Sequence, residues 1–199
     1  MAVFSKRVWL LIAIGLGLVP LAWFVTAWIT YPSDRTPEGA YLRIVAGVNR
    51  GRPEAFFPYI EAPAQNACFT IREYRRSARQ RVLASYPEPE RSRIAAEYEA
   101  EANAPDGSYV FALYAQRRRW LDRLRHDMSG IAKVQIDGAR ATIETVRGTR
   151  YPFRLRENGI WGLTLFTATL VAEAEKAARD DSMIKEAAAD YDRAKKRAQ

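Results

Sequence analysis

Hydrophobic and polar positions along the chain follow three successive patterns: a long uncharged run, then helical spacing, then alternation. The run from Val8 to Ile29 contains no ionisable side chain. As an α-helix with a rise of about 1.5 Å per residue, it is roughly 30 Å long, which matches the hydrocarbon core of a bilayer. The pattern therefore predicts a transmembrane helix over residues 8–30, preceded by a short head at residues 1–7.

Basic residues set the orientation expected for this helix. Lys6 and Arg7 directly precede the run, and the positive-inside rule places them in the cytoplasm. The rest of the chain then lies in the periplasm, as in a single-pass protein of a bacterial-type inner membrane. A cleaved signal peptide is the alternative, because Val25 and Ala27 are suited to a cleavage site, although signal peptides have apolar regions of only about 7–15 residues.

After a neck at residues 31–36, apolar residues recur at the spacing of α-helices. Thr36 and Pro37 combine an N-cap residue with a proline at the first helical position, so a helix is expected to begin there. Pro53 repeats the proline signal for a second, short helix. The first helix has one apolar stripe, formed by Tyr41, Ile44, Val45 and Val48.

A third helix is expected to begin at Asn66 as its N-cap and to end near Ser85, although residues 69–71 also fit a short strand. In the helical interpretation, one face is apolar and consists of Ile71, Tyr74, Ala78 and Val82. The other face carries a row of arginines at helical spacing, which we call the arginine row: Arg72, Arg75, Arg76 and Arg79.

Two more helices complete this part of the chain. Residues 90–102 form an alanine-rich helix with acidic side chains. Residues 108–128 are expected to form one continuous helix that Gly130 ends. Its inward positions are Val110, Leu113, Trp120, Leu121, Leu124 and Met128.

The period then changes to two, which is typical of half-buried strands. Asp137-Gly138 and Asn158-Gly159 are two-residue hairpin turns by composition, so Ile136 is expected to pair with Ala139 and Leu155 with Gly162. A bulge at Arg150 is expected after the turn at residues 148–149, because it keeps the apolar side chains on one face. The result is a four-stranded antiparallel meander.

The two faces of this meander differ along the chain. One face is apolar and consists of Val134, Ile136, Ile143, Tyr151, Phe153, Leu155 and Phe166. In the last strand, Trp161, Leu163 and Leu165 then lie on the opposite face, so this strand is apolar on both sides and needs a second cover. The cover is a helix from about Leu170 onward, a second copy of the chain, or another protein.

Together these patterns predict an α+β fold: a transmembrane helix, helices packed on a twisted antiparallel meander over residues 37–170, and a helical extension over residues 171–199. The extension is charged and alanine-rich, and it ends in Lys195-Lys196-Arg197, which indicates a solvated segment.

Two segments carry a resemblance to a known superfamily. Residues 36–55, TPEGAYLRIVAGVNRGRPEA, resemble the opening of nuclear-transport-factor-2-like domains, and residues 150–166, RYPFRLRENGIWGLTLF, resemble their final hairpin. The resemblance covers about residues 36–170 and implies an α+β cone. This superfamily includes isomerases and cyclases with an acidic base and tyrosine or acidic oxyanion donors inside the cone, and also non-catalytic binding and assembly modules. Fold alone does not choose between them.

The candidate chemistry of the chain is sparse. Cys68 and His126 are its single cysteine and histidine, so neither an internal disulfide nor a multi-histidine metal site can form. The sequence has no P-loop, dinucleotide fingerprint or nucleophile elbow. We therefore expect no catalytic residues, cofactor or metal, and a binding or assembly function. The alternative is a small-molecule-binding protein, or an isomerase-like or cyclase-like enzyme, that uses Tyr151 or Tyr114 in the cone interior.

A formal net charge of +8 favours anionic partners. The arginine row is the candidate site for anionic lipid headgroups or an acidic protein, whereas the alternative is a solvated face neutralised by Glu90, Glu97 and Glu101. Nucleic acid is not expected for an exported domain. Partner binding at the sheet face or cone, including a homodimer through the sheet, is assigned to Tyr151, Phe153, Trp161 and Phe166.

Overall fold

The structure is a computed structural model that describes residues 32–198. The predicted transmembrane helix over residues 8–30 lies outside the described residues. Within the described range, no helix combines the length and apolar character needed to cross a membrane. The chain divides into two compact units, Met1–Ser33 and Asp34–Gln199, and the second is described below.

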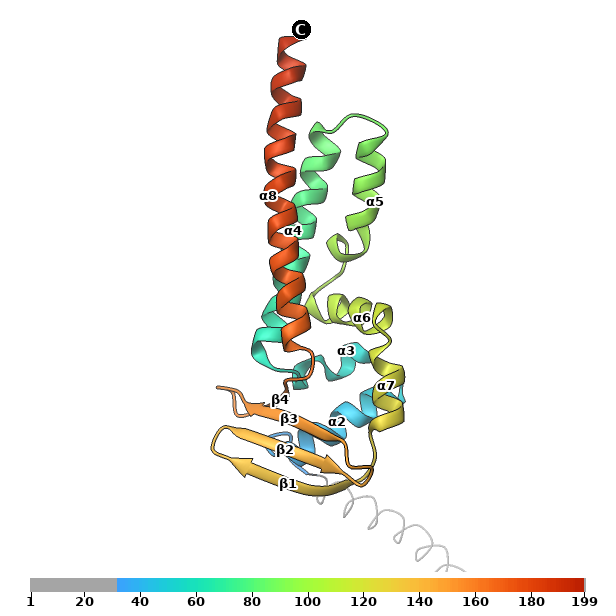
Figure 1. Cartoon of the computed structure of the whole chain (residues 1–199), viewed down its shortest axis with the longest axis vertical. Helices are drawn as coiled ribbons and strands as arrows, with labels where there is room; N and C mark the ends of the chain where they lie inside the picture. Colours follow the sequence, from blue (N-terminus) through green and yellow to red (C-terminus); the bar gives the residue numbers. More distant parts are fainter. Residues whose placement is uncertain (1–31, 199) are drawn as a thin grey trace, which may run out of the picture. The chain divides into compact units, whose positions relative to one another are not determined.

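This second unit is an α+β structure, as the sequence predicts (Figure 1). Helices α2, α3 and α7 lie near the sheet, whereas α4, α5 and α8 run side by side away from it (Figure 1). The described elements, in chain order, are α2 (Pro37–Asn49), α3 (Pro53–Phe56), the 3-10 helix η1 (Phe57–Tyr59), α4 (Ala62–Ser85), α5 (Glu90–Ala102), α6 (Gly107–Arg117), α7 (Trp120–Asp127), β1 (Ile131–Asp137), β2 (Arg140–Thr145), β3 (Arg150–Leu155), β4 (Trp161–Leu163) and α8 (Thr167–Arg197).

The first helices begin where the sequence signals lie, with one exception. The Thr36 side chain accepts a hydrogen bond from the backbone N–H of Gly39 at 3.1 Å, which confirms the N-cap of α2. Helix α4 confirms the helical interpretation of residues 69–71, but it begins at Ala62 rather than after Asn66. The proline in its first turn explains the earlier start, because proline suits a position whose N–H has no helical partner.

The single helix expected over residues 108–128 is wrong: the structure has α6 and α7 with a break between them. Arg119 lies in the left-handed region, with φ of 54°. On a straight helix Trp120 is about 120° around the axis from Tyr114. The break turns Trp120 into the core, where its ring lies 5.8 Å from that of Phe111.

The sheet has the predicted order β1-β2-β3-β4, but the register of each hairpin differs from the prediction. In the first hairpin the turn is at residues 138–139, so Ile136 pairs with Ala141 instead of Ala139. A shift by two residues leaves every side chain on its predicted face. The predicted bulge at Arg150 is also wrong, because Arg150 pairs regularly with Glu144 and the irregularity lies at residues 131–133 of β1.

The last hairpin is shifted by one residue, which reverses the faces of β4. The Arg156 N–H donates to the Ile160 carbonyl at 3.0 Å, so the loop has three residues and Leu155 pairs with Trp161 instead of Gly162. Trp161 and Leu163 therefore share the inner face with Phe153. The predicted second apolar face does not form in β4, because Trp161 and Leu163 lie on the inner face, and a dimer through the sheet stays a prediction.

Two clusters of buried apolar side chains hold the unit together. The larger lies between the sheet and the nearby helices, and the smaller joins α4, α5 and α8. Helix α8 is buried against its neighbours at intervals as far as Ala188. The extension predicted over residues 171–199 is therefore the main length of α8, and the solvated part expected there follows Tyr191, whose ring lies 4.8 Å from that of Tyr86. The smaller cluster consists of Ala78, Val82, Tyr86, Ala95, Tyr98, Ile184 and Ala188.

Candidate functional site

The arginine row lies where α4 meets α5 and α8. Arg75, at its centre, is only 7% exposed. Its guanidinium donates to the Asp180 carboxylate of α8 at 2.6 Å and lies 4.5 Å from the ring centre of Tyr98 in α5. Arg75 therefore joins three helices and does not present its charge to an outside partner. Asp180 is 105 residues away in sequence, so local spacing could not identify it.

The other three arginines of the row hold α5 against α4. Arg72 and Arg76 donate to the carbonyls of Ala104 and Ala102 at 2.7 and 3.4 Å, and Arg79 donates to a carbonyl within α5. The carbonyls at a helix C-terminus lack helical partners and carry partial negative charge, so cations there satisfy and stabilise them. The arginine row therefore acts mainly in contacts within the protein.

The acidic neighbours of the row match the predicted ones only in part, because Glu101 acts electrostatically on Arg75 whereas Glu99 was not predicted. Arg79 pairs with Glu99 at 3.4 Å, and Glu101 instead pairs with Arg117 of α6. Arg76 and Arg79 also line a surface hollow of about 320 Å³ with Gln80, Ala102 and Asn103. Within the arginine row, Arg76 and Arg79 are therefore the residues that an external anion can reach at this hollow.

The four aromatic candidates of the sheet face are all buried in the core. Tyr151, Phe153 and Trp161 point from the inner face, and Phe166 lies just before α8. The Phe166 ring lies 4.6 Å from Trp120 and 5.2 Å from Phe111. Phe111, which the sequence analysis did not identify as inward, is fully buried at the centre of these ring contacts. Packed rings fill this part of the space between the sheet and the helices.

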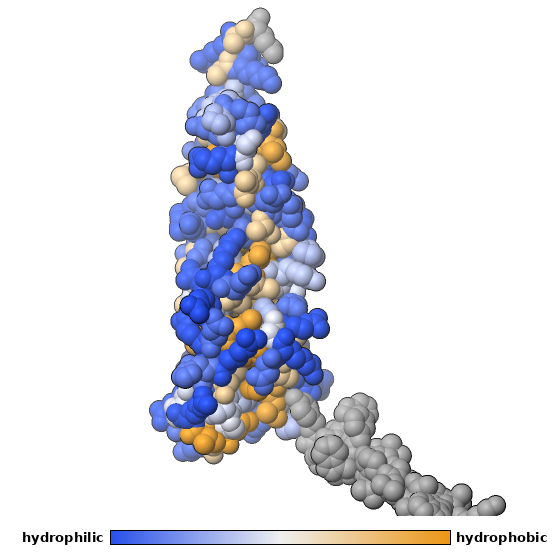
Figure 2. Space-filling model, turned by 90° about the vertical axis from the view of Figure 1, so that its right-hand side faces the viewer, coloured by the Kyte–Doolittle hydropathy of each residue, from blue (hydrophilic) through white to orange (hydrophobic). Residues whose placement is uncertain are grey.

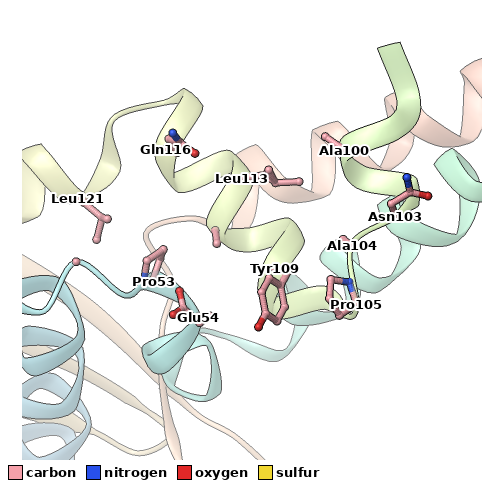
Figure 3. Close-up of a pocket in the computed structure, with 12 residues that line it drawn as sticks. Pro53, Glu54, Ala100, Asn103, Ala104, Pro105, Tyr109, Leu113, Gln116 and Leu121 are labelled. Carbon is pink, nitrogen blue, oxygen red and sulfur yellow. The ribbon is translucent and has the colours of Figure 1, made fainter. Parts of the chain in front are cut away.

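An elongated groove, which we call the α3–α6 groove, opens on the helical surface with a volume of about 550 Å³. Its labelled side chains extend from Leu121 and Pro53 at one end, past Tyr109, to Pro105 and Asn103 at the other (Figure 3). Most of the lining is apolar, and Tyr109 is 49% exposed. Leu113, predicted to point into the core, lines this groove instead, whereas Leu121 lines the groove and also packs against the core.

The surface around α5, α6 and α7 is mainly hydrophilic, with separate hydrophobic patches along its middle and at the sheet end (Figure 2). The exposed apolar side chains include Phe69 of α4, whose ring packs against Gly107 at the start of α6. Exposed aromatic residues beside an apolar groove are typical of contact surfaces.

A second hollow, of about 360 Å³, lies between α7, β3 and the start of α8, and we call it the Tyr151 hollow. Tyr151 is 2% exposed, and its hydroxyl is the single buried side-chain polar atom without a hydrogen-bond partner among residues 32–198. Burial raises the pKa of Tyr151, and the nearby Tyr41 and Asp127 raise it further. The phenol therefore stays protonated and is a hydrogen-bond donor.

Tyr114, the other proposed polar handle, lines a separate cleft among α4, α5, α6 and α8. Its hydroxyl lies 3.5 Å from the Glu173 carboxylate, and burial raises the pKa of Tyr114. Arg118 also pairs with Glu173, at 2.5 Å. An acid and a tyrosine do meet here, but they lie among the helices and not on the inner face of the sheet.

The remaining candidate groups are the Cys68 thiol, the His126 side chain and clusters of metal ligands. Burial raises the pKa of the Cys68 thiol to about 12, so it is not a thiolate nucleophile near neutral pH. His126 lies in the last turn of α7, and its backbone carbonyl accepts a hydrogen bond from Arg147. No group of three or more potential metal ligands occurs within residues 32–198.

Comparison of the chain with models of protein families, with curated proteins and with solved structures gives no match. The resemblance to nuclear-transport-factor-2-like domains therefore stays a prediction. The fold and the contacts described above define an α+β protein with a packed core and open surface sites.

Proposed function

We propose that this chain is a single-pass, membrane-anchored binding or assembly module, with residues 34–198 facing the periplasm. The uncharged run at residues 8–29 supports the anchor, and Lys6 and Arg7 support the orientation. One structural observation supports the binding function: packed rings fill the core at Phe111 and Phe166, while an apolar groove is open at the surface.

The α3–α6 groove is the contact surface in this proposal. Its apolar lining and elongated form suit an apolar segment of a partner protein, because burying such surface from water drives association. Tyr109 supplies an exposed ring of the kind that contributes strongly to interfaces. Anionic contacts at Arg76 and Arg79, which line a hollow on another side of α5, remain a prediction of the charge pattern.

Site-specific photocrosslinking in intact membranes tests this contact surface. A photoreactive phenylalanine analogue at Tyr109 of the full-length protein should give one discrete crosslinked product. The same analogue at Arg140, exposed on the outer sheet face, should not give that product. The substitution Leu113→Glu should abolish the Tyr109 product, because it places a charge on the groove lining.

Thermal unfolding of Leu113→Glu provides the folding control, and its transition should stay close to that of the parent because Leu113 is only half-buried. Equal products at Tyr109 and Arg140, or a Tyr109 product that survives Leu113→Glu, would contradict a partner in the groove.

A further inference from the structure

The Tyr151 hydroxyl is the least satisfied polar group of the described structure. A buried donor without a partner destabilises a fold by roughly 1–3 kcal/mol, so such groups are rare outside sites with a role. Tyr151 and Asp127 both line the hollow, and the Asp127 carboxylate is one of the groups that raise the pKa of Tyr151. The other side of the Tyr151 ring packs on Tyr41, with ring centres 5.7 Å apart.

The Tyr151 hollow has the composition of a small-ligand site. Its volume of about 360 Å³ falls in the range of roughly 300–1,000 Å³ found for ligand pockets. Trp120, Leu124 and Phe166 form an apolar wall, and Thr149 and Thr169 add hydroxyl groups. An apolar wall with a few polar groups suits a small organic molecule.

One of the three arginines at the hollow, Arg123, is available to pair with an anion. Arg118, Arg123 and Arg150 line it, against one carboxylate, Asp127. Arg118 and Arg150 already pair with Glu173 and Glu144. Arg123 is exposed, donates to the Arg118 carbonyl at 2.8 Å and forms no ion pair within residues 32–198, so its guanidinium is free to pair with a ligand's carboxylate.

The backbone beside the hollow is also unusual. Arg119 adopts φ of 54°, a conformation that is unfavourable by about 1–2 kcal/mol for residues other than glycine. Its two neighbours, Arg118 and Trp120, both line the hollow. Strained backbone of this kind is found at binding sites, where it holds flanking side chains in place.

We propose that the Tyr151 hollow binds a small organic carboxylate with an apolar body. In this assignment the carboxylate accepts a hydrogen bond from the Tyr151 hydroxyl and pairs with Arg123, while the body packs on Trp120 and Phe166. The site is separate from the α3–α6 groove, so it goes beyond the proposed partner binding. Either can fail without the other.

Calorimetric titration of the full-length protein in detergent with three matched probes tests this assignment. Benzoate is the carboxylate, benzamide its neutral analogue and benzylammonium its cationic analogue. Benzoate should bind in the millimolar range or tighter, benzamide roughly tenfold more weakly, and benzylammonium should not bind measurably. Tyr151→Phe and Arg123→Gln should each weaken benzoate binding roughly tenfold or more, because each removes a donor to a charged group.

Two controls keep the result interpretable. Tyr109→Phe alters a tyrosine in the α3–α6 groove and Arg140→Gln an arginine on the outer sheet face, and neither should change benzoate binding. Tyr151→Phe keeps the ring and removes only the hydroxyl, so an unchanged or higher thermal transition shows that it folds. The proposal is overturned if benzoate does not bind, if benzamide binds equally well, or if Tyr151→Phe binds benzoate as tightly as the parent protein does.

Discussion

At the scale of single residues, Cys68 shows how burial decides chemistry. It lies fully buried in α4, where the pKa of its thiol rises from 9.0 to about 12. We expect a thiol reagent to leave the native protein unmodified near neutral pH and to react fully in denaturant. Rapid native labelling would contradict the burial of this side chain.

The same thiol makes stability depend on alkaline pH. The raised pKa means that the folded state keeps its proton more tightly than the unfolded state does. The protonated thiol's contribution to the free energy of unfolding is complete below pH 9. This contribution is lost as the pH rises from 9 toward 12, by at most about 1.4 kcal/mol per pH unit. Cys68→Ala should fall less steeply in denaturant titrations across this range, and a slope equal to the parent's would contradict the shift.

Gly162 permits the contact between β4 and the start of α4. A Cβ atom here would lie 2.8 Å from the Ile60 carbonyl oxygen, and the Glu61 N–H donates to the Leu163 carbonyl at 3.0 Å. Gly162→Ala should therefore destabilise the protein by about 2 kcal/mol in urea titrations. Gly130→Ala is the matched control, with its nearest contact at 3.6 Å, and should change stability by less than about 1 kcal/mol.

At the scale of elements, the break between α6 and α7 depends on the left-handed conformation of Arg119. Arg119→Gly should stabilise the protein by about 0.5 kcal/mol, because glycine adopts this φ without strain and the exposed pair with Asp122 contributes little. Arg119→Val should destabilise it by about 1 kcal/mol or more, because a β-branched residue fits poorly there. Chemical denaturation midpoints that move in the same direction for both variants would contradict this explanation.

Helix positions and strand order were predictable because each depends on local spacing and capping. Thr36, Pro37 and the alternation of β1 are signals of this kind. Hairpin register was less predictable, because Asn158-Gly159 fits loops of two or three residues and a single residue reverses the faces of β4. The correct face of Trp161 follows only from tertiary contacts, including its hydrogen bond to the Arg35 carbonyl.

At the scale of the whole molecule, Arg75 and Asp180 join α4 to α8. Arg75→Met should destabilise the protein by about 3 kcal/mol, because it leaves a partly buried carboxylate without its partner. Arg75→Met combined with Asp180→Met should recover most of this loss. The exposed Arg52–Glu54 pair is the control, and Arg52→Met should change stability by less than about 1 kcal/mol. Additive effects in the Arg75–Asp180 double-mutant cycle would contradict the coupling.

The sites were less predictable than the fold because their residues converge from distant parts of the chain. The arginine row could be seen in the sequence as a pattern. Its partners, Asp180 and the backbone carbonyls at the end of α5, could not be seen there. The Tyr151 hollow combines α7, β3 and α8, and the sequence identified Tyr151 as an aromatic residue of the sheet face and a possible polar group of a small-molecule site, but not the other residues around it. No local signal in the sequence indicates that its hydroxyl lacks a partner.

The central claim, a membrane-anchored domain outside the cytoplasm, can be tested directly because the single native cysteine is buried. Arg140→Cys places an exposed thiol on the domain, and Ser5→Cys places one in the N-terminal head. In spheroplasts, a membrane-impermeant maleimide should label Arg140→Cys on the membrane-bound protein and should label Ser5→Cys only after lysis. Labelling of Ser5→Cys before lysis together with protection of Arg140→Cys, or release of the labelled domain without its N-terminal segment, would contradict the account.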